Sequence, residues 1–147
     1  MKQTLFLGLI AASLIGWAQK PQKSTPVKQV DMRWGSSEQL QSPALNTEAF
    51  RKLMSARVLP VEAGWQVRGF EFTYAERGMY EDSAGNPLMV VDYLTEYCPG
   101  DTLTRNIKNL LPARVKRGDT AYIANIRLEG ASGKMASGKP LRVMITK

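Results

Sequence analysis

The side chains of this 147-residue chain that could act as nucleophiles or acids are few and scattered. It contains no histidine, so Ser-His-Asp catalysis, Cys-His catalysis and the usual zinc sites lack the imidazole that they require. Its single cysteine, Cys98, stands near Glu96 and Asp101, and neighbouring carboxylates raise the pKa of a thiol. We therefore expect Cys98 to be a buried or incidental thiol and not a catalytic nucleophile.

Carboxylates on predicted strands are the remaining candidates for acid–base chemistry: Glu71, Asp92, Glu96 and Glu129. A glycosidase pair needs two carboxyl groups that face each other in a cleft, one with a raised pKa, and the sequence indicates neither. Outward-facing strand charges explain these residues better, because charged side chains are mostly exposed. We predict a protein that is not an enzyme and has no cofactor or metal; a hydrolase that uses Cys98 or Glu96 is the least favoured alternative.

One segment imitates a nucleotide-binding loop. Residues 133–139 match the Walker phosphate loop, but Pro140 stands where that loop requires Ser or Thr, so the hydroxyl that binds magnesium is missing. The residues that follow alternate as a strand, whereas a phosphate site needs a helix N-terminus. We predict a Gly/Ser/Lys hairpin loop here.

Basic residues crowd one loop of a chain whose formal net charge is +7. Arg114, Lys116 and Arg117 lie between Pro112 and Gly118. Such a patch suits an acidic partner or a lipid headgroup, and a solvated loop that merely contains basic residues is the alternative. We take these three residues as the candidate partner-binding site.

Residues 1–18 predict a secretory signal peptide. Lys2 precedes an apolar run over residues 5–15, and small residues at 16 and 18 offer a cleavage site. The run is shorter than the roughly twenty residues that span a bilayer, so we expect a periplasmic chain without a transmembrane span after cleavage. An uncleaved N-terminal anchor is the alternative. For an exported chain we expect no nucleic-acid partner.

The rest of the chain divides into an arm and one domain. Residues 19–45 are rich in Lys, Gln, Ser and Pro and predict a flexible arm or linker, although loose alternation over residues 27–34 leaves an edge strand open. Residues 46–147 predict the folded domain. It begins with one amphipathic helix of about three turns, capped by Asn46 and ending before Pro60.

After Gly64 the apolar period changes from helical to alternating, which predicts strands. A strand from Trp65 to Tyr74 has a phase slip at Gly69, which indicates a β-bulge, and a turn at residues 83–87 joins it to a second strand over 88–97. A short helix or folded loop follows over 103–111. Outward-facing Tyr or Trp side chains on these strands would be anchors for a partner.

The last third predicts a strand over 120–129, a polar connection over 130–138 and a closing strand over 141–145, paired inside the sheet. Alternation in the first of these places on one face Tyr122, Ala124, Ile126 and Leu128. Recurring turn signals between short strands are typical of sandwiches. The predicted fold is mainly β, an immunoglobulin-like antiparallel β-sandwich with one short N-terminal helix.

This last stretch resembles a known family. The segments 69–72, 117–120 and 122–127, then Gly130 with Gly133 and a closing apolar strand, resemble the C-terminal domain of the gliding-motility protein GldM, over residues 64–147. The resemblance implies an immunoglobulin-like domain in the periplasm of Bacteroidota, which binds ring components of the type nine secretion and gliding machinery and catalyses nothing. GldM itself begins with a transmembrane helix and several stalk domains, so this chain would be a standalone relative of the terminal module.

The function that these observations favour is a non-enzymatic, exported protein–protein interaction module, an accessory of the type nine secretion and gliding machinery. Its partners would be envelope proteins such as secretion-ring components. The alternative is a soluble periplasmic binder of an envelope glycan or lipid. The sequence leaves the oligomeric state open.

Overall fold

The computed structural model describes residues 26–36 and 44–146. The predicted signal peptide, residues 1–18, lies outside the described residues, as do residues 19–25 and 37–43 of the predicted arm. Among the helices that the structure describes, none has both the length and the apolar character needed to cross a membrane.

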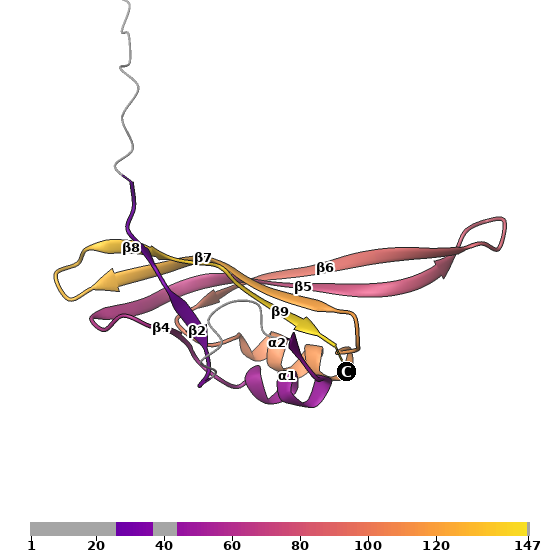
Figure 1. Ribbon diagram of the computed structural model, residues 1–147, viewed down its shortest axis with the longest axis horizontal. Coiled ribbons are helices and arrows are strands. Elements are labelled where there is room, and N and C mark those ends of the chain that lie inside the picture. The colour runs from indigo at the N-terminus through magenta and orange to yellow at the C-terminus, as the bar shows by residue number, and fades with distance from the viewer. Residues whose placement is uncertain (1–25, 37–43, 147) are drawn as a thin grey trace, which may run out of the picture.

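A large curled sheet dominates the described part of the chain (Figure 1). Its central strands follow the order β1-β8-β7-β5-β6, and β9 pairs with both β7 and β3. The strands are β1 (Gln29–Val30), β3 (Ala44–Leu45), β5 (Trp65–Glu81), β6 (Pro87–Pro99), β7 (Thr120–Gly130), β8 (Met135–Gly138) and β9 (Leu141–Ile145). A second, antiparallel sheet consists of β2 (Met32–Trp34) and β4 (Val58–Pro60).

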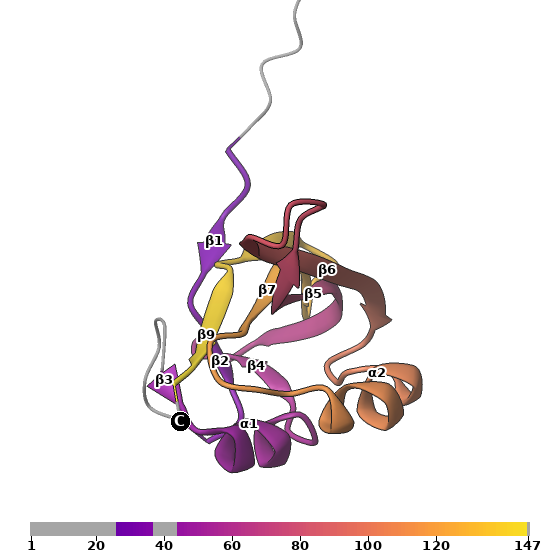
Figure 2. The ribbon, with the colours of Figure 1, turned by 90° about the vertical axis from the view of Figure 1, so that its right-hand side faces the viewer.

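Two short helices lie on the same side of the large sheet: α1 (Thr47–Leu53) and α2 (Arg105–Leu110), which continues into the 3₁₀ turn η1 (Leu111–Ala113) (Figure 2). The core fills the space between. Trp34 of β2 packs edge-on against Phe50 of α1 and Phe72 of β5, with ring centroids 5.9 and 6.2 Å apart. The predicted mainly-β, sandwich-like fold is confirmed, with α2 as a second short helix beside the predicted N-terminal one.

The core begins earlier in the chain than the domain boundary predicted at residue 46. Val30, Met32 and Trp34 are buried, because β1 pairs in parallel with β8 and β2 pairs with β4. The edge strand that the sequence left open over residues 27–34 is therefore present as two short strands. Their side chains are part of the core, so this segment of the predicted arm belongs to the domain.

The predicted face of β7 is wrong in its first half. Ala121 and Ile123 are buried, as are Ile126 and Leu128, so the inward phase shifts between positions 123 and 126. Asn125 lies at the shift with φ +51°, and the register against β5 shifts there. Tyr122 and Ala124 consequently point away from the core. The bulge predicted in β5 at Gly69 is confirmed, by a second register shift beside that residue.

Four other elements can be compared with their predictions. The helix after Asn46 is seven residues long, because the chain turns before Val58 and enters β4. The polar connection over 130–138 contains β8, which pairs with the second half of β7. Of the short helix or folded loop predicted over 103–111, the structure has the helix, as α2 with η1. The closing strand is paired inside the sheet, as β9.

Candidate functional site

The β5–β6 hairpin extends beyond the rest of the fold. Its strands pair continuously from Gly69 opposite Pro99 to Glu81 opposite Pro87, whereas β5 pairs with β7 only as far as Ala75. We call residues 76–92 the arm from here on; it is distinct from the arm or linker predicted over residues 19–45. Among the described residues no third strand accompanies it, and it projects to one side of the molecule (Figure 1). Six residues per strand at about 3.4 Å each give it a reach of about 20 Å.

The arm and the part of β6 beside it carry most of the large apolar side chains that the described surface exposes. Met79 is 69% exposed and Tyr93 is 70% exposed. The others on this hairpin are Tyr80, Leu88, Met89, Val91 and Tyr97. Five of the seven share one face of the hairpin, and exposed apolar side chains gathered on one face can mark an interaction site.

One face of the arm continues the core side of the sheet, and side chains of the arm itself cover it. Tyr80 and Gly78 share this face, and a Cβ atom on Gly78 would lie 2.6 Å from Cε2 of Tyr80. The ring therefore lies over the glycine, and the Tyr80 hydroxyl donates a hydrogen bond to Oδ2 of Asp92 (3.1 Å). That bond raises the pKa of Tyr80. Glycine at position 78 thus gives the ring room to bridge the two strands.

The opposite, outer face of the hairpin presents side chains in cross-strand pairs. Met79 lies opposite Met89, and farther from the tip Tyr93 lies opposite Ala75. Toward the body the side-chain oxygens of Thr73 and Thr95 lie 3.0 Å apart. Apolar and tyrosine side chains on one exposed face are typical of interface anchors. Sequence reasoning expected such anchors without locating them.

The predicted basic site lies at the base of the arm. Arg114 and Lys116 both bind the carboxylate of Glu76, with Nη2–Oε2 and Nζ–Oε1 distances of 2.5 and 3.0 Å. Desolvation raises the pKa of Glu76, but the hydrogen bonds from Lys116 and Arg114 outweigh it and hold the pKa below its ordinary 4.5. Two of the three predicted residues therefore brace the arm, while Arg117 is exposed. Their role in partner binding stays a prediction.

A buried carboxylate that sequence reasoning missed fixes the same loop. Asp119 is 1% exposed and accepts three hydrogen bonds. The donors are the Tyr74 hydroxyl (2.5 Å) and the backbone N–H groups of Arg77 (2.8 Å) and Lys116 (3.1 Å). Asp119 thereby ties the basic loop to β5 at the point where the arm leaves the sheet. Its place after Gly118 predicts a turn but not a buried acid.

Cys98 is fully buried on β6. Desolvation raises its thiol pKa and outweighs the opposing hydrogen bond with the Thr104 backbone; the charge of Glu96 adds to the rise, and that of Lys108 opposes it. A thiol in this state is a poor nucleophile at neutral pH, which agrees with the expectation of a buried cysteine.

The structure does not bring the four candidate carboxylates together as a pair. Glu71 lies on the outer face of β5 and its register partner is Tyr97, whereas Glu96 lies on the other face, opposite Phe72. Each carboxylate is held by different neighbours: Glu71 by Asn125, Asp92 by Tyr80, Glu96 by Thr104 and Asn106, and Glu129 by Arg68.

The Walker-like segment is a hairpin turn with a strand. Gly133 has φ +72° and its N–H donates to the carbonyl of Gly130 (3.0 Å), which closes the turn between β7 and β8. The strand β9 then follows, where a phosphate site needs a helix N-terminus. The prediction of a hairpin loop is confirmed, with the addition of β8.

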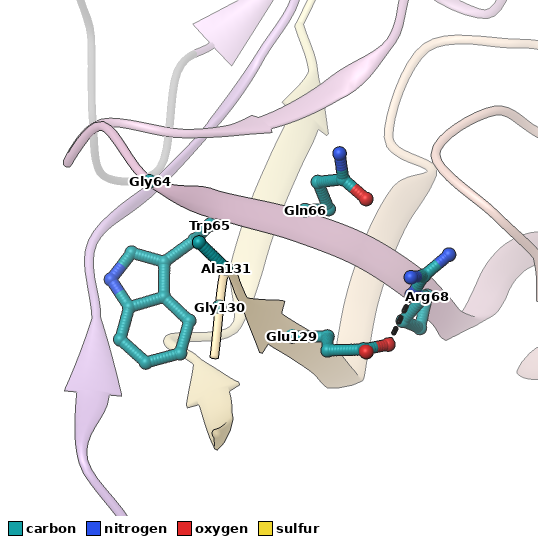
Figure 3. A pocket seen from close by; sticks show the side chains of 7 residues that line it. All are labelled: Gly64, Trp65, Gln66, Arg68, Glu129, Gly130 and Ala131. Atoms are coloured by element: carbon teal, nitrogen blue, oxygen red, sulfur yellow. Dashed lines mark hydrogen bonds and ion pairs between the residues drawn. The ribbon is translucent and has the colours of Figure 1, made fainter. Parts of the chain in front are cut away.

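A shallow groove of about 490 Å³ lies at the other end of β5 (Figure 3). Its lining residues are Gly64, Trp65, Gln66, Arg68, Glu129, Gly130 and Ala131. Trp65 lies opposite Gly130 in the sheet, and the ammonium of Lys28 is 5.3 Å from its ring centroid. Gln66 lies opposite Glu129 in the sheet, so these two side chains share the face opposite to the Trp65 ring. Arg68 forms an ion pair of 2.5 Å with Glu129. The groove therefore presents polar groups on one face of the sheet and the aromatic ring on the other.

Comparison with family models and with curated proteins yields no match to this chain. The resemblance to the GldM domain therefore stays a prediction from the residues quoted for it.

Proposed function

We propose that this chain is an exported, periplasmic protein–protein interaction module that binds another envelope protein through the outer face of its β5–β6 arm. The observation that carries the proposal is the projection of the arm beyond β7 with Met79, Met89, Val91 and Tyr93 exposed. Fully burying one such side chain is worth about 1.5–3 kcal/mol. A few of them supply the driving force of an ordinary interface.

The bracing at the base of the arm favours the same function. Ordering a loose segment on binding costs free energy that must be subtracted from the affinity. Here Glu76 is already held by Arg114 and Lys116, and Tyr80 already bridges Gly78 to Asp92. An arm that is ordered before the encounter retains more of the free energy of apolar burial.

The identity of the partner rests on the sequence resemblance alone. We propose that the protein is an accessory of the type nine secretion and gliding machinery and that its partners are ring components of that machinery. The support is the set of segments over residues 69–127 that resemble the GldM terminal domain.

The test is site-specific photo-crosslinking in the envelope of the source organism. A photoreactive amino acid replaces Met79, on the arm, or Lys52, which is exposed on α1 far along the chain from the arm. We expect a crosslinked envelope protein from position 79 and none from position 52. Identification of that protein as a secretion-ring component would support the finer assignment.

Two variants separate the arm from the basic loop. Both variants are made in the chain that carries the photoreactive residue at position 79. Met89→Asp with Tyr93→Asp charges the outer face, and Arg117→Glu changes the exposed loop residue without touching the Glu76 ion pairs. We expect the first variant to abolish the crosslink from position 79 and the second to preserve it. Loss only with Arg117→Glu would move the contact to the loop, and no crosslink from position 79 would contradict the proposal.

The polar side of the groove favours one second candidate, binding of an envelope glycan. Gln66, Arg68 and Glu129 line it and offer planar hydrogen-bonding groups, which fix the orientation of ligands in such sites. Saturable binding of polysaccharide fractions in calorimetry, lost in Arg68→Ala and retained in Met79→Asp, would support this candidate. Equal heats for both variants would contradict it.

A further inference from the structure

The free edge of β6 is the longest unpaired strand edge of the described sheet. β6 has 13 residues, pairs with β5 on one side and is the last strand in the order β1-β8-β7-β5-β6. A strand edge of this length presents unpaired N–H and C=O groups to solvent and is a template for another strand.

The hydrogen-bonding phase of this edge follows from contacts at both ends of the hairpin. The backbone N–H of Asp82 donates to the carbonyl of Asn86 (2.9 Å), and the N–H of Gly100 donates to the carbonyl of Arg68 (3.1 Å). Because such pairs alternate along an antiparallel ladder, the even-numbered residues of β6 bond to β5. The N–H of Arg77, which points to Asp119 and away from β6, agrees with this phase. The odd-numbered residues 89, 91, 93, 95 and 97 therefore direct their backbone groups to the free edge.

Natural edge strands are protected by Lys side chains, interior prolines or bulges. β6 contains no Lys or Arg, and its prolines stand only at its two ends, Pro87 and Pro99. Its register against β5 is continuous from end to end, so it has no bulge on that side. Its two acids, Asp92 and Glu96, lie on the face of the hairpin occupied by Tyr80 and α2. The free edge of β6 thus has no Lys, no interior proline and no bulge to block pairing with another strand.

We propose that the β6 edge pairs antiparallel with β6 of a second copy of this chain, about a two-fold axis at Tyr93. This register joins all 13 residues over about 44 Å and makes about ten backbone hydrogen bonds between odd-numbered residues. It places Met89 opposite Tyr97 of the second copy and Val91 opposite Thr95. The sheet then continues through both molecules.

The charges on β6 select this register over its neighbours. With the axis at Tyr93, Asp92 faces Leu94 and Glu96 faces Val90 of the second copy. A shift of the axis by one residue, to position 92 or 94, sets Asp92 against Asp92 or Asp92 against Glu96, and like charges directly opposite each other are destabilising. A shift by two residues avoids this but leaves strand ends unpaired. Full overlap and the absence of opposed acids coincide in one arrangement.

This inference rests on the proposed function in that both use the same hairpin, but they use different parts of it. Edge pairing occupies backbone groups along β6 and leaves the side chains of the outer face exposed. The two outer faces then form one surface across the two-fold axis, which doubles the area available to an envelope partner.

The first test is the mass in solution of the chain from residue 19 to 147, measured by sedimentation equilibrium over a wide range of concentration. We expect a dimer. Val91→Pro removes an edge-facing N–H without touching a hydrogen bond to β5, and prolines are tolerated at such edge positions. We expect it to be monomeric and to unfold in one cooperative transition whose midpoint, unlike that of the dimeric parent, does not depend on protein concentration. Val91→Ala keeps the N–H and serves as the matched control that stays dimeric. A monomeric parent chain, or a dimeric proline variant, would overturn the proposal.

The second test fixes the register and does not depend on the proline variant folding. In a Cys98→Ala background, Tyr93→Cys places two thiols at the axis, with Cα atoms about 5.5 Å apart, within the range of a disulfide. We expect mild oxidation to crosslink this variant to a covalent dimer and to leave Met89→Cys uncrosslinked. Crosslinking of Met89→Cys alone, or of neither, would contradict the two-fold axis at Tyr93.

The outcomes also separate this inference from the proposed function. If the chain is monomeric but position 79 still crosslinks to an envelope protein, self-pairing fails and the interaction module stands. If the chain is a dimer of the expected register and position 79 yields no partner, the self-pairing stands and the proposed function fails.

Discussion

Replacing Asp119 with alanine should destabilise the domain by about 3–5 kcal/mol. The carboxylate is buried and accepts hydrogen bonds from the Tyr74 hydroxyl and from the N–H groups of Arg77 and Lys116. Hydrogen bonds to a charged group contribute about 1.5–3 kcal/mol each. Burial of the carboxylate in the native state costs several kcal/mol, which must be subtracted from the sum of these three hydrogen bonds. The remainder is the net loss of about 3–5 kcal/mol. In the alanine variant the three donors have no acceptor.

The assay is equilibrium unfolding in urea, followed by circular dichroism, with the dependence on urea compared between variants. Tyr74→Phe removes only one of the three donors and should cost about 2 kcal/mol. Because the two groups share one hydrogen bond, the double variant should lose less than the sum of the single losses. A loss below about 1 kcal/mol for Asp119→Ala, or strict additivity in the double variant, would refute the argument that Asp119 organises this region.

The same hydrogen bond predicts a loss of stability at alkaline pH. Desolvation, followed by the hydrogen bond to Asp119 and its charge, raises the pKa of Tyr74 far above its ordinary 10.0. A raised pKa means that this stabilisation is complete below pH 10 and declines above it, because only the unfolded chain then releases the proton. The decline is about 1.4 kcal/mol per pH unit. The difference between the free energies of unfolding of the parent protein and Tyr74→Phe, measured against pH, isolates the contribution of Tyr74. Parallel pH profiles of the two proteins would contradict the assignment of this decline to Tyr74.

Three further outcomes follow from the core. Gly138→Ala should cost about 1–3 kcal/mol by overpacking, because its Cβ would lie 2.7 Å from Met32 and 2.9 Å from Ile126; urea unfolding measures this, and a loss no larger than that of Gly130→Ala would contradict it. Cys98 should react with a thiol reagent only after unfolding, since it is buried with a raised pKa; rapid labelling of the native protein would show that the thiol is accessible. A chain that begins at residue 46 should fail to fold, because it lacks the buried side chains of β1 and β2; a cooperative unfolding transition for that chain would show that those strands are dispensable.

Features set by short-range pattern were predictable from the sequence. The β5–β6 hairpin follows from alternation on both sides of a Gly-Asn-Pro turn, and the bulge beside Gly69 follows from a phase slip at a glycine. The helix after Asn46 has its cap in the expected place, with the Asn46 side chain accepting from the N–H of Ala49 (2.7 Å). Local signals of this kind act within a few residues.

Features that depend on distant strands were not predictable in the same way. The shift in β7 occurs at Asn125, an L-residue with positive φ, so no glycine marked it. The segment over residues 27–34 alternates only loosely and lies in a polar stretch of the chain, and it forms strands because it pairs with β8 and β4. The exposure of the arm likewise depends on β5 ending its pairing with β7 at Ala75. Glu76 binds Arg114 and Lys116 at the base of the arm, through contacts between residues distant in sequence.

The pairing of β1 with β8 and of β3 with β9 has a consequence for the time at which the chain folds. Val30 meets Gly138 and Leu45 meets Ile145, so the first strands acquire their partners only when the last ones have been synthesised. Contacts between residues so distant in sequence make folding slow. These two pairs therefore cannot close in a nascent chain until residues 138 and 145 have been synthesised. For a chain exported as we propose, this delay keeps it competent to thread through a membrane before it closes.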